Sequence, residues 1–243
     1  MSLSERIANW IKAQVENSGK KGIILGLSGG IDSAVVAALC KKAVGDSVFA
    51  LMLPCGSNQD DLKAAHLVAK KFNIKTKEVC LDEMFKDFSR LFPEANALAK
   101  ANLKPRLRMS TLYYFANSLD YIVTGTGNKS ELMVGYFTKY GDGGTDILPL
   151  GDLLKKDVRE LAKELDIPNE IIKRPPSAGL WQGQTDEKEM GISYEELDAA
   201  IIAIETGDAV TIDKDVLKKV KSMIAGSEHK RLAIPIFKMY PVS

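Results

Sequence analysis

The stretch Gly22-Ile-Ile-Leu-Gly-Leu-Ser-Gly-Gly-Ile-Asp-Ser33 decides how the rest of the chain is interpreted. Its first half is a continuous apolar run, typical of a strand buried on both faces, and it enters a second apolar run through a glycine turn. Two adjacent glycines let the backbone approach an anion closely, and a helix that follows offers free N–H groups and the positive end of its dipole. The stretch therefore predicts a strand, a phosphate-binding loop and a helix.

The side chains of this loop favour a bound nucleotide. Ser28 and Ser33 add hydroxyl donors, and Asp32 is suited to a magnesium ion that bridges phosphates. The alternative is a tight turn in which Asp32 only caps the helix, but Ser-Gly-Gly-x-Asp-Ser carries more than a turn needs. The loop matches neither the Walker A pattern, which needs Gly-Lys-Ser/Thr, nor the dinucleotide pattern Gly-x-Gly-x-x-Gly.

The same alternation of strand and helix continues along the chain. Ser2 and Glu5 have the spacing of a capping box for an opening helix that ends at Ser18-Gly19. Further strands are expected at residues 47–53, 76–81 and 121–124, with a helix at 59–72. This order predicts an α/β fold, an open doubly wound parallel sheet with helices on both faces.

Helices are expected to dominate the rest of the chain. Residues 83–118 have a helical pattern interrupted at Pro93 and Pro105, which predicts two or three helices. After residue 150 helices are expected at 153–165, 194–205 and 214–225, with a polar loop at 174–191. We expect one domain over residues 1–243, with its core at about 20–150 and a helical C-terminal cap with loops at about 151–243.

Composition excludes several classes of protein. The chain has 243 residues and a formal net charge of +1, so no overall field would attract nucleic acid or an anionic membrane. It contains no run of about 20 apolar residues. The three cysteines, Cys40, Cys55 and Cys80, are widely spaced, which argues against a disulfide framework or a zinc site. A cytoplasmic protein with reduced thiols is expected.

A second polar segment follows the strand at 121–124, where open α/β sheets bind their ligands. Thr126 is placed to contact a nucleotide, and Glu131 to hold the magnesium ion from a second side. The alternative for Glu131 is a solvated helix start beside the dipole.

Positive charge at a helix start marks the next region. The glycine-rich segment 137–146 predicts a functional loop. Lys155 and Lys156 fall in the first turn of a helix expected to begin at Asp152, where a cation opposes the dipole by about 0.3–1 kcal/mol. A bound anion would remove that conflict, whereas the alternative is two solvated lysines.

The loop from Gly26 to Ser33 resembles the pyrophosphate-binding loop of the N-type ATP pyrophosphatases, which cleave ATP between its α and β phosphates to adenylate a substrate. The later segments, GTGNKSEL, GYFTKYGDGGTDILPL, RPPSAGLWQGQTDEKEMG and SEHKR, closely resemble the NAD synthetase family. The resemblance extends from about residue 22 to 235, and GYFTKYGDGGTD together with SEHKR is its most specific part.

The resemblance implies the ligands and the residues that bind them. ATP would contact Gly26, Leu27, Ser28, Gly29, Gly30, Ile31, Asp32, Ser33, Thr126, Lys155 and Ser177, and Mg²⁺ would be held by Asp32 and Glu131. Deamido-NAD would contact Arg106, Lys139, Asp146, His229 and Lys230, although Arg106 could also be a surface charge and His229 a solvated cap. Family members are homodimers with the dinucleotide site at the interface, and a homodimer is expected here.

The nitrogen donor is expected to be free ammonia or ammonia from a partner, because the amidase domain of glutamine-dependent relatives would not fit before Gly22. Three departures from the family pattern concern the adenine side and the dinucleotide side: Met52, Cys55-Gly-Ser-Asn-Gln59 and Pro105. Arg106 is still carried over, because Arg-x-Arg-Met is retained as Arg106-Leu-Arg-Met109.

The implied chemistry is adenylation of the nicotinate carboxylate, followed by displacement of AMP by ammonia. Lys155 and Asp142 are the expected catalytic residues, Asp142 by binding ammonium and taking its proton, and residues 179–191 are a candidate lid. Rival interpretations are a GMP synthetase-like amidating core, a thiolase, and an ATP-binding sensor without catalysis. The pair Asp32 and Glu131 favours chemistry over sensing.

Overall fold

A four-stranded parallel sheet forms the centre of the protein. The structure, a computed structural model, describes residues 1–177, 185–208 and 212–239. The strands are β1 (Gly22–Gly26), β2 (Val48–Met52), β3 (Lys75–Glu78) and β4 (Tyr121–Thr124), in the order β3-β2-β1-β4. From β1 the chain adds β2 and then β3 on one side, and it returns to add β4 on the other side of β1. The direction of winding therefore reverses after β3.

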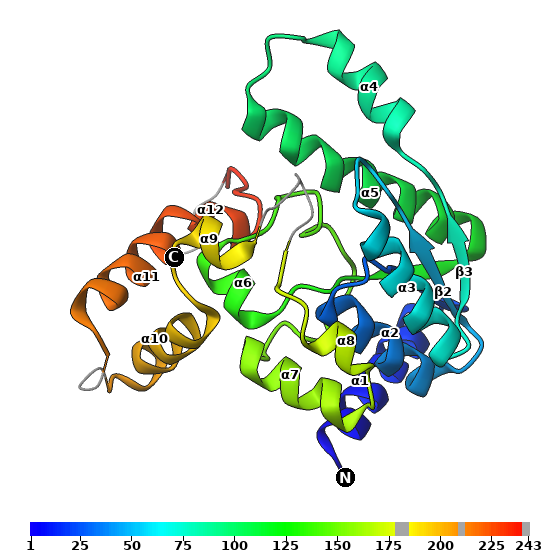
Figure 1. The fold of residues 1–243 in the computed structure, drawn as a ribbon, viewed down its shortest axis with the longest axis horizontal. Helices are drawn as coiled ribbons and strands as arrows, with labels where there is room; N and C mark the ends of the chain where they lie inside the picture. The colour runs from blue at the N-terminus through cyan, green and yellow to red at the C-terminus, as the bar shows by residue number, and fades with distance from the viewer. Residues whose placement is uncertain (178–184, 209–211, 240–243) are drawn as a thin grey trace.

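Helices cover both faces of this sheet. On one face α2 (Ile31–Val44) and α3 (Gln59–Lys71) contact the strands, and on the other α5 (Ala97–Leu119) packs on β1 and β4. Two further helices, α1 (Leu3–Ser18) and α7 (Lys155–Glu164), pack on α2 (Figure 1). The doubly wound parallel sheet expected from the alternation of apolar runs is confirmed.

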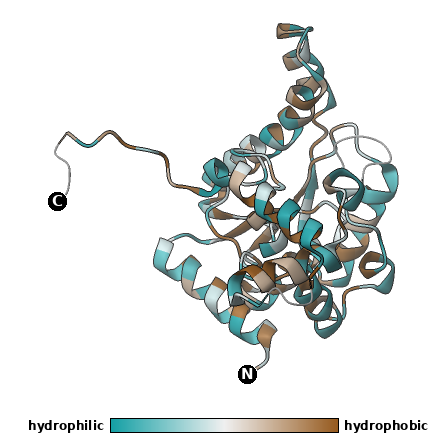
Figure 2. Cartoon of the chain, turned by 90° about the vertical axis from the view of Figure 1, so that its left-hand side faces the viewer, coloured by the Kyte–Doolittle hydropathy of each residue, from teal (hydrophilic) through white to brown (hydrophobic). Residues whose placement is uncertain are grey.

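A second apolar cluster lies in the C-terminal region. It joins α6 (Lys129–Val134), α10 (Tyr194–Thr206) and α11 (Lys214–Gly226) through residues that include Val134, Tyr194, Leu197 and Val220. The shorter helices are α8 (Asn169–Ile172), α9 (Asp186–Met190) and α12 (Glu228–Arg231), and α4 (Asp82–Leu91) lies at the periphery. After α12 the chain runs away from the body (Figure 2). Within the described residues no helix is long and apolar enough to span a bilayer.

Three expectations about helices need correction. Pro105 does not interrupt a helix, because α5 continues through it and buries its ring against the loop at Gly141. Packing there compensates for the hydrogen bond that a proline removes. Residues 174–191 are not all loop, since α9 lies within them, and α7 begins at Lys155 rather than Asp152. The candidate lid at 179–191 lies partly outside the described residues, which resume at Thr185.

The carboxyl ends of the strands create the place for a site. Parallel strands end at one edge of the sheet, where Gly26, Met52 and Thr124 lie on neighbouring strands. From this edge β1 passes directly into the glycine loop and α2, and β4 passes into α6. The polar segments singled out in the sequence therefore converge there.

Candidate active site

The loop between β1 and α2 is braced by hydrogen bonds of its own hydroxyl groups. The hydroxyls of Ser28 and Ser33 lie 3.0 Å apart, Ser33 also donates to the carbonyl of Gly30 at 3.0 Å, and the Gly30 N–H donates to Ser28 at 3.3 Å. Gly29 has a φ of +85°, and a Cβ there would collide with the carbonyl oxygen of Asp61 and lie 3.0 Å from Cβ of Ala64. This position therefore requires glycine.

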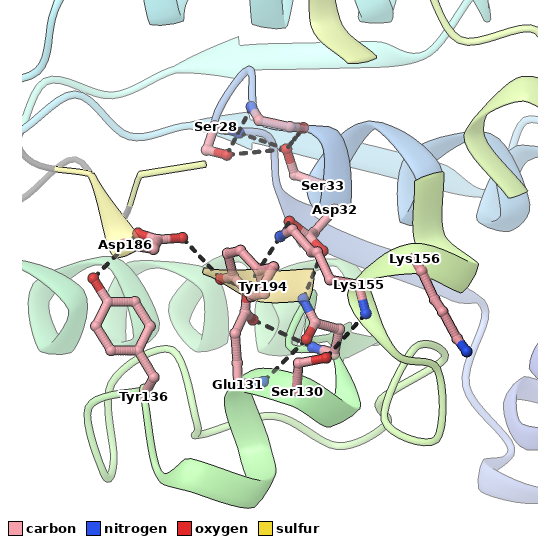
Figure 3. A network of polar contacts seen from close by, with 12 residues as sticks. Ser28, Asp32, Ser33, Ser130, Glu131, Tyr136, Lys155, Lys156, Asp186 and Tyr194 are labelled. Carbon is pink, nitrogen blue, oxygen red and sulfur yellow. Dashed lines mark hydrogen bonds and ion pairs between the residues drawn. The ribbon is translucent and has the colours of Figure 1, made fainter. Parts of the chain in front are cut away.

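Asp32, in the first turn of α2, is held by two groups from distant parts of the chain. The amide Nδ2 of Asn128 donates to Oδ1 at 2.9 Å, and Nζ of Lys155 donates to Oδ2 at 2.6 Å (Figure 3). Asn128 is completely buried and forms a capping box with Glu131 at the start of α6. The cap of one helix thus positions the carboxylate of another.

Lys155 joins the two predicted metal ligands. Its side chain is 1% exposed, and Nζ also lies 3.3 Å from Oε1 of Glu131. Burial alone would lower the pKa of Lys155, but Asp32 and Glu131 raise it above its ordinary value, so the amine stays charged. The interpretation of two solvated lysines is wrong for Lys155, whereas Lys156 is exposed and points away from the network (Figure 3).

Backbone groups of α7 are satisfied by a separate pair of side chains. The N–H of Lys155 donates to the hydroxyl of Ser130 at 2.9 Å, and the N–H of Lys156 donates to Asp198 at 2.9 Å. Ser130 in turn donates to Asp198. This buried pair binds the backbone N–H groups at the start of α7. The bonds to Asp32 and Glu131 are made by the side-chain ammonium of Lys155 alone.

The donor set fits a hard cation that takes most of its ligands from elsewhere. Among the described residues there is no group of three or more His, Cys, Asp or Glu that could hold a metal ion. Asp32 and Glu131 nevertheless converge on one cation, the ammonium of Lys155. Mg²⁺ is commonly bound by one or two carboxylates, with phosphates and water completing its shell. The residues present fit magnesium in the presence of a nucleotide.

Two tyrosines and two acidic residues extend the network. The hydroxyl of Tyr194 lies 3.2 Å from Oε1 of Glu131 and 3.0 Å from Oδ2 of Asp186. The ammonium of Lys155 lies 4.8 Å from the centroid of the Tyr194 ring. On the far side of Asp186, the hydroxyl of Tyr136 lies 3.1 Å from Oδ1 of Asp186 (Figure 3). The same hydroxyl lies 2.8 Å from Oε2 of Glu189, so the two carboxylates share its one hydrogen.

A second group of predicted residues gathers around the loop at 135–146. Arg106 of α5 donates to the carbonyl of Lys139 at 3.4 Å, and Nζ of Lys139 donates to the carbonyl of His229 at 2.6 Å. Nζ of Lys230 donates to the carbonyls of Gly135 and Phe137 at 2.7 and 2.8 Å. Residues from α5, the loop and α12 are thus brought together.

Asp142 lies in the same loop, and its carboxyl group is desolvated. The residue has exposed surface, yet protein surrounds its carboxyl group closely enough that desolvation raises the pKa of Asp142 above its ordinary value. The Thr138 N–H donates to Oδ1 at 2.9 Å. A carboxyl held in this way has the environment of a proton acceptor.

The sequence of nearly the whole chain matches one family model. The model described as NAD synthase matches residues 3–234. The chain belongs to the NAD synthase family. Among curated relatives, the NH(3)-dependent NAD(+) synthetase of Archaeoglobus fulgidus is 49% identical over 235 residues, which cover 96% of this chain and 94% of that protein.

Solved structures of the family have the same fold. A protein described as NMN synthetase from Francisella tularensis superposes with a TM-score of 0.90 at 38% identity, covering 98% of both chains. The NH3-dependent NAD synthetase from Campylobacter jejuni, in complex with the nitrate ion, superposes with a TM-score of 0.85 at 32% identity, covering 97% of this chain and 98% of that one.

Three further predicted residues lie near the end of β4 and beside the gap at 178–184. Asp146 holds the end of β4, accepting from the Val123 N–H at 2.7 Å and from the Tyr113 hydroxyl at 2.8 Å. Thr126 is half-buried after β4, and Ser177 is exposed at the last described position before the gap at 178–184. Their nucleotide contacts stay predictions.

Sequence reasoning missed several residues of the candidate site. Asn128 had a recognisable signal, because Asn128 and Glu131 have capping-box spacing directly after a strand. Asp186 and Tyr194 had none, since the packing of α10 against α6 brings the Tyr194 hydroxyl to Glu131, and the same hydroxyl reaches Asp186.

Proposed function

We propose that this protein catalyses the ATP-dependent amidation of deamido-NAD with ammonia, releasing NAD, AMP and pyrophosphate. The observation that carries the proposal is the position of the buried Lys155 ammonium between Asp32 and Glu131. This places the ammonium beside the first turn of α2, the helix that follows the glycine loop and contains Asp32. Positive charge, free N–H groups and two carboxylates at one point suit ATP with magnesium. The curated relatives, NH(3)-dependent NAD(+) synthetases at 49% and 46% identity, supply the substrate class.

The first step joins the nicotinate carboxylate to the α-phosphorus of ATP and expels pyrophosphate. A carboxylate is already a nucleophile, so this step needs orientation and charge neutralisation rather than a base. The loop from Gly26 to Ser33 binds the leaving phosphates through its N–H groups, while Lys155 neutralises charge that develops on them. When bound, magnesium would be held by Asp32 and Glu131 and would withdraw electrons from the phosphate oxygens.

The second step needs ammonia rather than ammonium. Asp142 binds the ammonium cation and accepts its proton, after which ammonia attacks the carbonyl carbon of the adenylate. The bond from that carbon to the phosphate oxygen breaks, AMP leaves with the bonding electron pair, and the nitrogen loses its second proton to solvent. Arg106, Lys139, Asp146, His229 and Lys230 bind deamido-NAD in this scheme. Near-normal turnover of Asp142→Asn at saturating ammonium would refute the role of Asp142.

The protein acts as a homodimer in this proposal, with the dinucleotide site at the interface. Support comes from α4, which has no buried residue and exposes Met84, Phe88 and Leu91 to between 50% and 78%. A monomer rarely leaves such a continuous apolar surface uncovered. Sedimentation velocity should give a dimer for the wild type and a monomer for Phe88→Lys, whereas Trp10→Lys, at a 43% exposed position on α1, should stay dimeric.

A cytoplasmic location is part of the same proposal. Cys40, Cys55 and Cys80 are free thiols in the structure, as a reducing compartment would keep them. Localisation of a tagged copy by cell fractionation tests this point.

One assay tests the reaction. ATP, magnesium, deamido-NAD and ammonium are incubated with the enzyme at mildly alkaline pH, NAD is measured with a dehydrogenase, and AMP by chromatography. Equal amounts of NAD and AMP are expected. Replacing ammonium by glutamine should abolish the product, and consumption of no ATP at all would favour the sensor instead.

A second candidate substrate is the mononucleotide acid that would yield NMN. It is favoured by one observation, the TM-score of 0.90 to the structure described as NMN synthetase. The same assay run with nicotinate mononucleotide decides between the two acids by the ratio of their kcat/KM values. A larger value for the mononucleotide would replace deamido-NAD in the proposal.

A further inference from the structure

Tyr194 occupies a position at which a single hydroxyl group meets two carboxylates. Its oxygen lies 3.2 Å from Oε1 of Glu131 and 3.0 Å from Oδ2 of Asp186. A phenol has one hydrogen to donate, so the two carboxylates share one donor. Glu131 is thereby linked to Asp186, a residue 55 positions later, through the side chain of a third helix.

The hydroxyl is held in place by rigid surroundings. The Tyr194 side chain belongs to the apolar cluster of α6, α10 and α11 and the residue is 1% exposed. Its backbone N–H donates to Oε1 of Glu187 at 2.9 Å, and the capping box of Ser193 and Glu196 fixes the start of α10. A donor so fixed constrains its acceptor.

Glu131 depends on this donor once a divalent cation is present. Oε2 of Glu131 accepts from the backbone N–H of Asn128 at 3.3 Å, and Oε1 lies 3.3 Å from Lys155 and 3.2 Å from Tyr194. A metal ion that binds between Asp32 and Glu131 competes with the ammonium of Lys155 for Oε1. Tyr194 and Asn128 then remain to orient the carboxylate.

We propose that Tyr194 is a positioning residue that orients Glu131 for the magnesium–ATP complex and does so through its hydroxyl group. The proposal rests on the proposed use of ATP and magnesium. It adds a residue that contacts neither substrate nor metal, and outer partners of metal ligands commonly change metal affinity 10- to 100-fold.

The test separates metal positioning from folding and from turnover. Binding of α,β-methylene ATP, which cannot be cleaved between its α and β phosphates, is measured by calorimetry with EDTA and with magnesium. The ratio of the two dissociation constants is the factor by which magnesium strengthens binding. Deamido-NAD and ammonium are omitted, so no product forms.

Tyr194→Phe keeps the ring over Lys155 and removes only the hydroxyl. The magnesium factor should fall about tenfold, with little change of affinity in EDTA. Tyr136→Phe is the matched control, because it also removes a hydroxyl that donates to Asp186, on the side away from Glu131 (Figure 3), and it should keep the wild-type factor. In a Glu131→Gln background Tyr194→Phe should have no further effect, since coupled residues are not additive.

Asp186→Asn provides a second variant in which Tyr194 is intact. A neutral amide competes less for the hydroxyl, so the magnesium factor should equal or exceed that of the wild type. Equal losses in Tyr194→Phe and Tyr136→Phe, a loss in Asp186→Asn, or an effect of Tyr194→Phe that persists with Glu131→Gln would each overturn the proposal. So would a wild-type protein to which magnesium gives no added affinity. A tenfold difference in binding without NAD formation would instead refute the proposed reaction and leave the role of Tyr194 standing.

Discussion

Nζ of Lys155 lies 2.6 Å from Oδ2 of Asp32, although 123 positions separate the two residues in the chain. The contact joins the first turn of α7 to the first turn of α2, two helices that pack against each other beside the sheet. Because Lys155 is 1% exposed, its charge is compensated by Asp32 and Glu131 rather than by water. The same geometry that stabilises this buried lysine places it at the glycine loop.

Lys155→Gln should impair both stability and catalysis. Removing one member of a buried ion pair leaves the other charge uncompensated and typically costs about 3–5 kcal/mol of stability. Asp32 and Glu131 are partly exposed, so water can solvate them, and we expect a loss of about 3 kcal/mol or less. Loss of a group that stabilises developing charge should reduce kcat by a factor of about 10²–10³. Urea unfolding and the NAD assay measure the two effects.

Lys156→Gln is the control for that variant. Lys156 is adjacent in sequence but exposed, so its unfolding free energy should change by less than about 0.5 kcal/mol and its kcat hardly at all. Equal losses in both lysine variants would show that the effect comes from the general charge of α7 and not from the contact with Asp32.

Gly29→Ala should abolish ATP binding and destabilise the protein strongly. The added Cβ would meet backbone and side-chain atoms of α3, at Asp61 and Ala64, and the phosphate loop would have to move. Gly19→Ala has the same kind of positive φ, +66° against +85°, but no neighbouring atom of the described residues lies within 4 Å of the added Cβ. That control should lose only about 1–2 kcal/mol of stability, the cost of a left-handed conformation for alanine. Its ATP affinity, measured by calorimetry, should be unchanged.

Asp142 should make stability depend on pH. Its pKa is raised from the ordinary value of 3.8, so the folded protein binds this proton more tightly than the unfolded chain. Ionisation of Asp142 therefore lowers the free energy of unfolding. This loss is absent below pH 3.8, grows as the pH rises toward the pKa of Asp142 in the folded protein, and is complete above that pKa. Asp142→Asn should gain stability relative to the wild type as the pH rises above 3.8, as measured by urea unfolding.

Asp46→Asn is the comparison for this pH dependence. The hydrogen bond and charge of Lys41 lower the pKa of Asp46, so any stabilisation is already complete above the unfolded value and is lost only at more acid pH. Its difference from the wild type should stay flat over the same range. A flat difference for Asp142→Asn as well would contradict the desolvated carboxyl.

The three thiols should differ sharply in reactivity. Cys40 and Cys55 are buried, and desolvation raises the pKa of Cys40 to about 12, so almost no thiolate exists there at pH 8. Cys80 is exposed. Ellman's reagent should label one thiol rapidly in the folded protein and three after unfolding, and Cys80→Ser should remove the rapid phase. A rapid phase that persists in Cys80→Ser would contradict the burial of the other two.

Local patterns were enough to predict the layers of the fold. The apolar run of β1, the glycine loop and the start of α2 follow one another in sequence, so their geometry depends on neighbouring residues. Pro105 shows the limit of such reasoning, because its tolerance inside α5 depends on contacts with the loop at Gly141. No pattern around Pro105 encodes those contacts.

By itself the sequence determined the parallel sheet, the phosphate loop with Asp32, and the family to which the chain belongs, since each is indicated by short local patterns and motifs that can be recognised without knowing their contacts. Only the tertiary structure decided that Lys155 and not Lys156 is buried, that Asn128 orients Asp32, and that Tyr194 links Glu131 to Asp186. These contacts join side chains between 63 and 123 positions apart, apart from the link of Tyr194 to Asp186, which spans 8. Their existence depends on how α2, α6, α7 and α10 pack, and packing is a property of the whole folded chain.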